Sequence, residues 1–464
     1  MLQIDRLSDT PFYIQIYMYF RKEIEAHRMP AGMKLSSVRE LAQTIEVSKM
    51  TVEKAYYQLA SEGYIIRHNR SRYAVAHLDA IKRDAEPVDN QNVTPVPIRY
   101  RYDFGSGDMD MNYFPMTEWR KSMNRVLSHP DALLANMDEQ GAPALRQALS
   151  QYVLDMRGVK ARPENIVISS GTVPLLALLA SLLQHDYNRI AVEEPGFKLG
   201  RELLRTMGYT ITPVALEKGE FSLEALEKSQ ARVVYVSPSH QFPTGTIMPV
   251  GTRYRLLRWA LASDGLIIED DYDSELRYQG RPVPALQSLD TEDRVVYMGS
   301  LSKILPPFIR LSFMVLPPHL LKRYNRSRSL FRLGASIPEQ CALADFIHNG
   351  GMARQIRRLR KHYIEKGAFL EGCLREAFDD TIRISPVESG VYCHVTLQSS
   401  LTANELIRRA AARGCRVLWF SSFYEHPNPA RDTEFLLSFS KIPAHELKEA
   451  VHALQQAWSE KEGV

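Results

Sequence analysis

The order of apolar and polar residues near the start of the chain predicts three helices. Between residues 11 and 25, apolar side chains recur three or four positions apart, which is the spacing of one face of a helix. A second helix is expected over 38–45, with capping-box spacing at 37–40, and a third over 49–62 after an N-cap at Ser48. Two short helices across a tight turn indicate a helix-turn-helix.

Two apolar segments after the third helix, 64–66 and 73–75, predict a β-hairpin with a cationic tip at 67–72. In a helix-turn-helix the start of the recognition helix enters the major groove of DNA, and nearby cations contact phosphates. The pattern favours DNA binding, although a small helical domain with a solvated charged loop would share it. The expected contact residues are Ser48, Lys49, Thr51, Lys54, Arg70 and Arg72.

The remainder of the chain alternates between strand-like and helical patterns. Apolar runs at 165–168, 189–192, 231–236, 265–268 and 294–298 are separated by stretches with helical spacing, such as 173–183 and 252–262. This alternation predicts an α/β domain with a mostly parallel sheet. The expected organisation is a DNA-binding domain at 1–76, a polar, proline-containing linker at 77–101 and a large domain at 102–464.

Composition narrows the class of protein only slightly. The net charge of +4 comes from both signs mixed along the chain, so it does not by itself indicate nucleic acid. The four cysteines are scattered and form no C-x-x-C pair, so no metal site is expected. No signal peptide and no apolar run of membrane-spanning length is present, so a cytoplasmic protein is expected.

Polar groups follow several of the predicted strands, where open α/β sheets bind ligands. Lys303 lies between two serines just after the strand at 294–298, and Arg310 follows it. A lysine amine can form a Schiff base with a carbonyl cofactor, and an arginine can hold a phosphate. An ordinary surface lysine is the alternative. Ser170, Gly171 and Thr172 begin a helix that would hold an anion, or that is simply capped.

Four carboxylates in five residues, at 269–273, follow the strand at 265–268. They repel one another unless they have partners. A metal site, a solvated turn, or one carboxylate paired with a protonated pyridine nitrogen would each explain them. Phe197, after an earlier strand, could stack on an aromatic ring or belong to the core.

Residues 35–42 and 47–64 resemble the GntR-type winged helix-turn-helix. The resemblance implies that Arg39 and the start of the recognition helix contact DNA. The wing of that family usually contains glycines, whereas Asn69, Arg70 and Ser71 stand here.

Residues 102–464 resemble fold-type I enzymes that use pyridoxal 5′-phosphate, in the aspartate aminotransferase group. The resemblance implies that Lys303 forms the internal aldimine, that Asp270 binds the pyridine nitrogen, that Tyr272 bonds the ring hydroxyl and that Phe197 stacks on the ring. The phosphate would be held by Ser170, Gly171, Thr172, Ser300 and Arg310.

The sequence departs from that group in three places. Asn136 stands where such proteins often have a tyrosine that reaches the phosphate of a neighbouring subunit. Phe242 stands where an asparagine usually bonds the ring hydroxyl, with His240 or Gln241 as possible replacements. The arginine that would hold a substrate carboxylate is ambiguous, with Arg416 as the first candidate and Arg431 as the second.

A winged helix in front of an aminotransferase-like domain is similar to the MocR/GabR subgroup of GntR regulators. The layout implies a homodimeric transcriptional regulator in which each winged domain is docked on the partner. It also implies that the protein senses an amino acid or related amine through external aldimine formation at Lys303. Three alternatives stay open: an aminotransferase with a DNA-binding appendage and at most weak activity, a sensor of pyridoxal phosphate itself, and a DNA-binding protein that uses an inactive enzyme domain for dimerisation.

Overall fold

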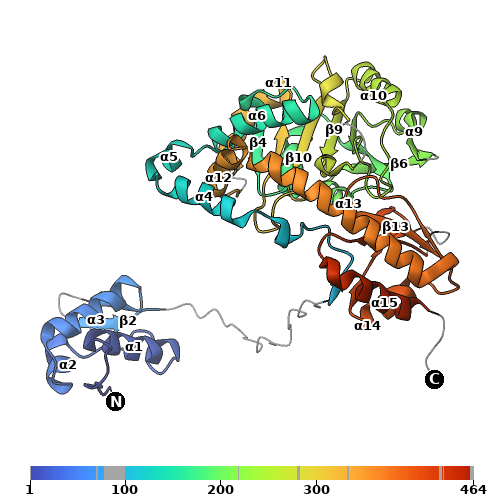
Figure 1. Cartoon of the computed structure of the whole chain (residues 1–464). Helices are drawn as coiled ribbons and strands as arrows, with labels where there is room; N and C mark the ends of the chain where they lie inside the picture. The colour runs from blue at the N-terminus through green and yellow to red at the C-terminus, as the bar shows by residue number, and fades with distance from the viewer. Residues whose placement is uncertain are drawn as a thin grey trace. The chain divides into compact units, whose positions relative to one another are not determined.

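The computed structural model consists of two compact units, Met1–Pro97 and Ile98–Val464, which are described separately. The structure describes residues 2–68, 72–77, 100–217, 219–278, 283–331, 334–427, 431 and 433–459. Figure 1 shows the elements of each unit with their labels. The linker predicted at 77–101 lies mostly outside the described residues.

The first unit contains three helices and a hairpin, as the sequence predicts. The elements are α1 (Phe12–Glu25), α2 (Val38–Thr44), α3 (Lys49–Ser61), β1 (Ile65–His68) and β2 (Arg72–Val75), with β1 and β2 antiparallel. The side chain of Ser37 accepts a hydrogen bond from the backbone amide of Glu40, and the carboxylate of Glu40 accepts one from the amide of Ser37. This capping box satisfies two amides at the start of α2.

The core of this unit forms where the apolar faces of α1 and α3 meet. Ile16, Val52, Tyr56 and Leu59 are fully buried there. The helical spacing of these residues places them on the inner faces of their helices and leaves the charged residues outside.

An eight-stranded sheet forms the centre of the second unit, in the order β4-β11-β10-β9-β8-β5-β6-β7. The pairs β10–β9, β9–β8, β8–β5 and β5–β6 are parallel, while β11 is antiparallel to both neighbours. The predicted mostly parallel sheet is therefore confirmed. The strands are β4 (Ile166–Ser169), β5 (Arg189–Glu194), β6 (Thr210–Glu217), β7 (Glu220–Phe221), β8 (Val233–Val236), β9 (Leu266–Asp271), β10 (Val295–Ser300) and β11 (Ser312–Val315).

Helices pack around this sheet and bury apolar residues from both sides of it. Most of α7 is buried against β4, β10 and β11, which is why its sequence is almost entirely apolar. The helices of the unit are α4 (Met116–Leu127), α5 (Pro130–Ala135), α6 (Pro143–Arg157), α7 (Thr172–Leu183), α8 (Lys198–Thr206), α9 (Leu223–Lys228), α10 (Val250–Ala262), α11 (Pro318–Ser327), α12 (Ile337–His348), α13 (Gly351–Phe378), α14 (Ala403–Ala412) and α15 (Leu447–Trp458).

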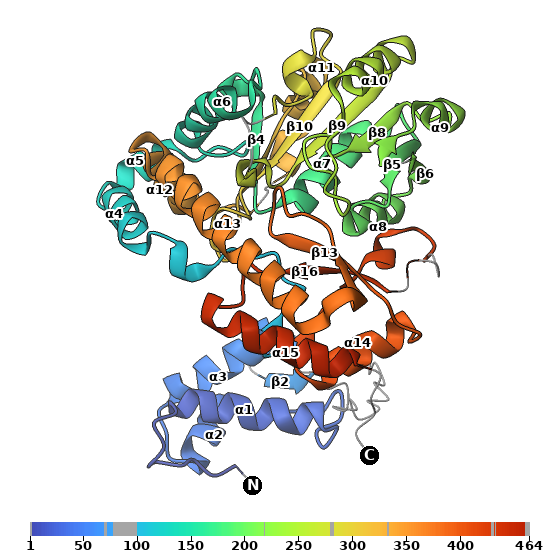
Figure 2. The ribbon, with the colours of Figure 1, turned by 45° about the vertical axis from the view of Figure 1, so that its right-hand side comes forward.

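A smaller sheet lies near the C-terminal end of the chain. It contains β12 (Ile382–Ile384), β13 (Tyr392–Leu397), β16 (Glu434–Ser438) and β15 (Leu418–Trp419), in that order. Figure 2 shows α14 and α15 beside it, at the end of the unit remote from α10 and α11. The start of the unit is tied to this region because β3 (Tyr102–Asp103) pairs with β14 (Cys415–Arg416). Within the described residues, no helix has the length and apolar character needed to cross a membrane.

Candidate functional site

Polar side chains that follow several strands of the large sheet meet at one cavity of about 330 Å³. The carboxyl ends of β9 and β10 deliver residues to it, because parallel strands end at the same edge of a sheet. The cavity brings together the predicted Lys303 and all eight predicted cofactor-binding residues. These are Ser170, Gly171, Thr172, Phe197, Asp270, Tyr272, Ser300 and Arg310.

The amine of Lys303 is held against the backbone near the start of the unit. Its Nζ donates a hydrogen bond of 2.9 Å to the carbonyl oxygen of Gly107. A side chain on Gly107 would collide with this Nζ and with the hydroxyl of Tyr392. Burial lowers the pKa of Lys303, with Asp273 and Asp108 acting in the opposite direction. A lysine with a lowered pKa is neutral more often and is therefore a better nucleophile.

The opposite wall of the cavity is suited to an anion. It contains the N-terminus of α7, where no side chain caps the helix and the first turn carries no acidic residue. Arg310 lies beside it and donates from Nε to the carbonyl oxygen of Ser170 over 3.2 Å. Gly171 has φ +152°, and a Cβ there would lie only 3.2 Å from Nη2 of Arg310. Free amides, the helix dipole and a guanidinium together favour a bound phosphate.

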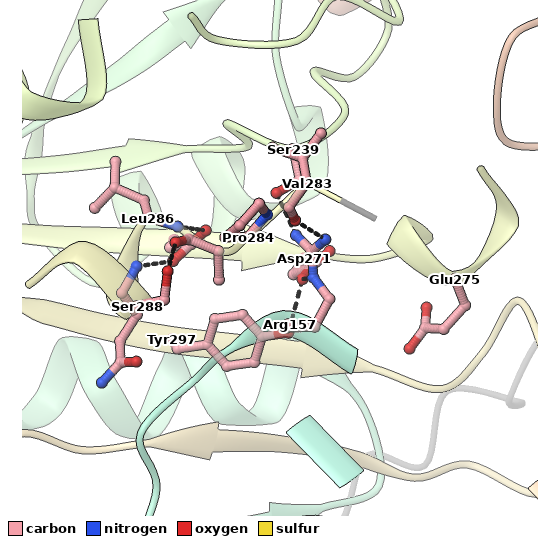
Figure 3. Close-up of polar contacts among 12 residues, drawn as sticks. Arg157, Ser239, Asp271, Glu275, Val283, Pro284, Leu286, Ser288 and Tyr297 are labelled. Carbon is pink, nitrogen blue, oxygen red and sulfur yellow. Dashed lines mark hydrogen bonds and ion pairs between the residues drawn. The ribbon is translucent and has the colours of Figure 1, made fainter. Parts of the chain in front are cut away.

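The acidic run at the end of β9 is divided between two faces because side chains alternate along a strand. Glu269 accepts hydrogen bonds of 2.7 and 2.8 Å from the amides of Leu286 and Gln287. Asp271 pairs with Arg157 over 2.8 Å and accepts from the hydroxyl of Tyr297 over 2.7 Å (Figure 3). The run is buried, so it is not a solvated turn, and no metal-binding group of three side chains exists among the described residues.

Asp270 points to the other face and lines the cavity. Its Oδ2 accepts a hydrogen bond of 2.5 Å from Tyr235, whereas its Oδ1 is buried and has no partner among the described residues. Burial raises the pKa of Asp270 to about 7. A buried carboxylate oxygen without a partner is unfavourable, so this atom is suited to a proton donor bound in the cavity.

Of the two candidates for replacing the missing asparagine, one reaches Tyr272. The hydroxyl of Tyr272 lies 3.1 Å from Nδ1 of His240, and that nitrogen lies 2.8 Å from Asp273. Burial opposes protonation of His240, but the carboxylate of Asp273 outweighs it and raises the pKa of the imidazole. Gln241 instead donates from Nε2 to the carbonyl oxygen of Pro195 over 2.8 Å.

Neither arginine proposed for a carboxylate is among the described residues that line the cavity. Arg416 is half exposed, with Nη1 3.7 Å from Asp103. Arg431 pairs with Glu434 over 2.8 Å and lies against the rings of Phe420 and Tyr424.

Contributors to the site that were not predicted include Gly107, Asp108, Tyr235 and Tyr392. Tyr235 interrupts a run of valines in β8, which is the one local signal for it. The other three lie far in sequence from the strands of the large sheet.

The first unit presents its predicted DNA contacts at the start of α3 and on nearby elements. Arg39, Lys49 and Arg72 are exposed. Ser48 caps α3, with its Oγ 2.7 Å from that of Thr51, and Lys54 lies 3.9 Å from the centroid of the Tyr13 ring. Arg70 falls outside the described residues.

Two family models match the chain, one for each unit. "Bacterial regulatory proteins, gntR family" matches residues 12–75, and "Aminotransferase class I and II" matches residues 102–454. The two matches follow one another without overlap, in the order that the sequence predicts.

Similar proteins match over nearly the full length. The chain is 35% identical to the uncharacterized HTH-type transcriptional regulator YdeL of Bacillus subtilis, with 98% of each chain covered. It is 32% identical to the probable rhizopine catabolism regulatory protein MocR of Rhizobium meliloti, with 99% of this chain and 96% of that protein covered. The fold is also similar to a solved structure, that of LysN, an α-aminoadipate aminotransferase of Thermus thermophilus complexed with N-(5'-phosphopyridoxyl)-L-leucine. The TM-score is 0.68 at 25% identity, and the match covers 77% of this chain and 91% of that chain.

Proposed function

The chain belongs to the MocR-type transcriptional regulators of the GntR family, which join a helix-turn-helix unit to an aminotransferase class I and II domain, and from this premise we propose that it senses a small amine. The helix-turn-helix unit binds DNA, and the aminotransferase class I and II fold implies pyridoxal 5′-phosphate as the cofactor. The identity of the effector and the manner of sensing are the proposed part.

The residues of the cavity fit this cofactor. The observation that carries the proposal is the unpartnered Oδ1 of Asp270, which lines the same cavity as the amine of Lys303. A protonated pyridine nitrogen would give that oxygen its missing hydrogen bond. Ser170 and Thr172, at the N-terminus of α7, and Arg310 beside them would hold the phosphate.

When bound, the cofactor supplies an aldehyde carbon that combines reversibly with primary amines. The effector amine competes with Nζ of Lys303 for that carbon. Release of Lys303 from that carbon would change the contacts of its amine with Gly107 and Tyr392, and with them the start of the large unit. An effector regulates only if it binds two states of the protein with different affinity, so this local change must differ between the DNA-binding states.

We place the protein in a homodimer. Large apolar side chains near α4 and α5 are exposed in the single chain, namely Leu127 (54%), Leu134 (66%) and Met137 (67%). Apolar groups gathered in one region of a surface commonly mark an interface. A dimer also presents two helix-turn-helix units to two half-sites of DNA. Light scattering should give twice the mass of the chain, and a monomer at micromolar concentration would contradict this part of the proposal.

The first experiment is an absorption titration of the full chain with pyridoxal 5′-phosphate, beside Lys303→Ala. Lys322→Ala, on the exposed face of α11, is the matched control. The proposal expects a band near the edge of the visible range that needs Lys303 and that shifts when one member of an amine panel is added. A shift accompanied by a change in DNA affinity completes the test.

The other outcomes separate the alternatives. A Lys303-dependent band that no amine disturbs, with DNA binding that follows the cofactor alone, would mean that the protein senses the cofactor. Turnover of an amino acid with a keto acid would instead indicate an aminotransferase. The absence of a Lys303-dependent band would leave the large unit without a ligand role.

A further inference from the structure

Part of the cavity wall is not needed to hold the cofactor, and it is acidic. Asp108 lines this part together with Phe242 and Tyr392. The hydroxyl of Ser106 donates a hydrogen bond of 2.8 Å to Oδ2 of Asp108. Among the described residues Asp108 makes no ion pair, although it lies close enough to Lys303 to act on the pKa of that amine. The wall therefore presents a negative charge that a bound molecule can neutralise.

Among the described residues that line the cavity, no cation is left over for an effector carboxylate. Among the described residues, the lining cations are Lys303 and Arg310, and the proposed function assigns both to the cofactor. Arg416 lies near Asp103 instead, and Arg431 pairs with Glu434. On β16, Leu436 belongs to the apolar cluster against which Phe242 and Tyr392 pack.

The rings around this wall also favour a cation. Phe242 makes edge-to-face contacts with Tyr272 and Tyr392, both with centroids 5.9 Å apart, and with Phe423 at 4.8 Å. The Nζ of Lys303 already lies 5.6 Å from the centroid of the Tyr392 ring. Aromatic faces attract ammonium groups at this distance, and most strongly where water is excluded.

We propose, resting on the proposed function, that the effector is an amine whose far end carries a second positive charge, such as a diamine, and that Asp108 selects it. One amine of the effector reaches the cofactor, while the other lies between Asp108 and the aromatic wall. A carboxylate at the far end would meet Asp108 with like charge and no compensating cation, which is the repulsive element that specificity requires. The effector is on this view not an α-amino acid.

The test compares three amines of similar length on the full chain loaded with pyridoxal 5′-phosphate. The probes are 1,4-diaminobutane, 4-aminobutan-1-ol and 4-aminobutanoate, which differ in the charge of the far group. Half-saturation is measured from the absorption change and, independently, by calorimetry. The diamine is expected to half-saturate at a concentration at least tenfold below that of the other two. Equal or tighter binding of the alcohol or the carboxylate would overturn the selection.

Two substitutions test whether Asp108 causes the preference for the diamine. Asp108→Asn keeps the size and the contact with Ser106 but removes the charge, so the advantage of the diamine should fall to within about twofold of the neutral probe. Asp155→Asn changes an exposed carboxylate on α6 that does not line the cavity, and it should leave the advantage intact. An unchanged advantage in Asp108→Asn would overturn the role of Asp108. If that variant does not fold, the series of three amines on the natural protein still decides the charge of the effector.

The absorption spectra distinguish a failure of the diamine proposal from a failure of the proposed amine sensing. A spectrum that responds to 4-aminobutanoate or an α-amino acid, but not to the diamine, refutes the second positive charge and leaves amine sensing in place. A spectrum that responds to none of the amines, across the full panel, removes amine sensing and this inference with it.

Discussion

Gly107 shows how closely the backbone approaches the reactive amine. Its carbonyl oxygen accepts the hydrogen bond of Lys303, and the space where a Cβ would stand is taken by Nζ and by the hydroxyl of Tyr392. Gly107→Ala should therefore displace Lys303 and reduce the Lys303-dependent absorption at least tenfold at a fixed cofactor concentration. Gly372→Ala, at a helical glycine with open space around it, is the control and should leave the band unchanged. A normal band in Gly107→Ala would show that the segment can move aside.

Several buried carboxyls have a pKa well above the ordinary value. Burial raises the pKa of Glu193 to about 8, and those of Asp270, Glu269 and Glu275 to about 7. Such a group holds its proton more tightly when folded. The stability that this provides is present at low pH and is lost as the pH rises toward the folded pKa. The cofactor-free protein should consequently be less stable at pH 8 than at pH 5.5.

Thermal unfolding measures this effect. The midpoint should fall by roughly 5 °C between pH 5.5 and pH 8, which corresponds to about 2 kcal/mol for a domain of a few hundred residues. Glu193→Gln removes one of the titrating groups and should flatten the slope. A midpoint that rises over this range in the natural protein, or a slope unaffected by the substitution, would contradict the assignment.

At the scale of elements, helix α13 holds the first segment of the large unit through a buried ionic cluster. Oδ2 of Asp110 lies 2.8 Å from Nζ of Lys366 and 3.2 Å from Nε2 of His362, and Lys366 also donates to the carbonyl oxygen of Ser440 over 2.8 Å. Burial opposes ionisation of Asp110, but these two partners outweigh it and lower its pKa to about 2. The cluster links α13, the segment after β3 and the end of β16.

Removing one partner should be costly because it leaves a buried charge. Lys366→Met is expected to lower the free energy of unfolding by about 3–5 kcal/mol, measured in urea. Lys448→Met breaks a surface pair with Glu376 and should produce no measurable change. The double variant Asp110→Asn with Lys366→Met should recover part of the loss. A loss below about 1 kcal/mol in Lys366→Met would mean that water reaches the cluster.

Local patterns predicted the elements whose signals are local. The capping box at Ser37 and the strand that delivers Lys303 both follow from neighbouring residues, and both are present. Strand β11 was missed because its four residues follow two prolines and take their place only by pairing with β4 and β10. The sequence of β13 did offer a signal, because apolar Cys393, Val395 and Leu397 alternate with polar His394 and Thr396, and the prediction did not use it.

The site residues also divide into those with a local sequence signal and those brought together only by the fold. Asp270 and Lys303 follow strands and could be predicted, whereas Tyr235 meets Asp270 only because β8 and β9 are neighbours in the sheet. Asp108 and Tyr392 reach the cavity from opposite ends of the large unit's sequence. No spacing between residues encodes that meeting, since it depends on the smaller sheet and on the segment after β3.

At the scale of the whole molecule, the affinity for DNA should depend on salt more strongly than the modest net charge of +4 suggests. Lys49 is exposed at the start of α3, where a phosphate contact would release a counterion. Lys49→Ala should weaken binding to any duplex and reduce the slope of log affinity against log salt by about 1. Lys22→Ala, an exposed cation on α1, is the control. An unchanged slope in Lys49→Ala would place the helix differently on DNA.

The segment that brings Gly107 and Asp108 to the cavity is also the segment with which the large unit begins. Gly107 and Asp108 follow β3 by only a few residues, and the chain before β3 leads back to the helix-turn-helix. Any molecule that contacts Asp108 or frees Lys303 from Gly107 thus acts on the segment with which the large unit begins. Changing the number of residues between positions 77 and 101 should therefore alter the response of DNA binding to a ligand without altering the affinity for that ligand.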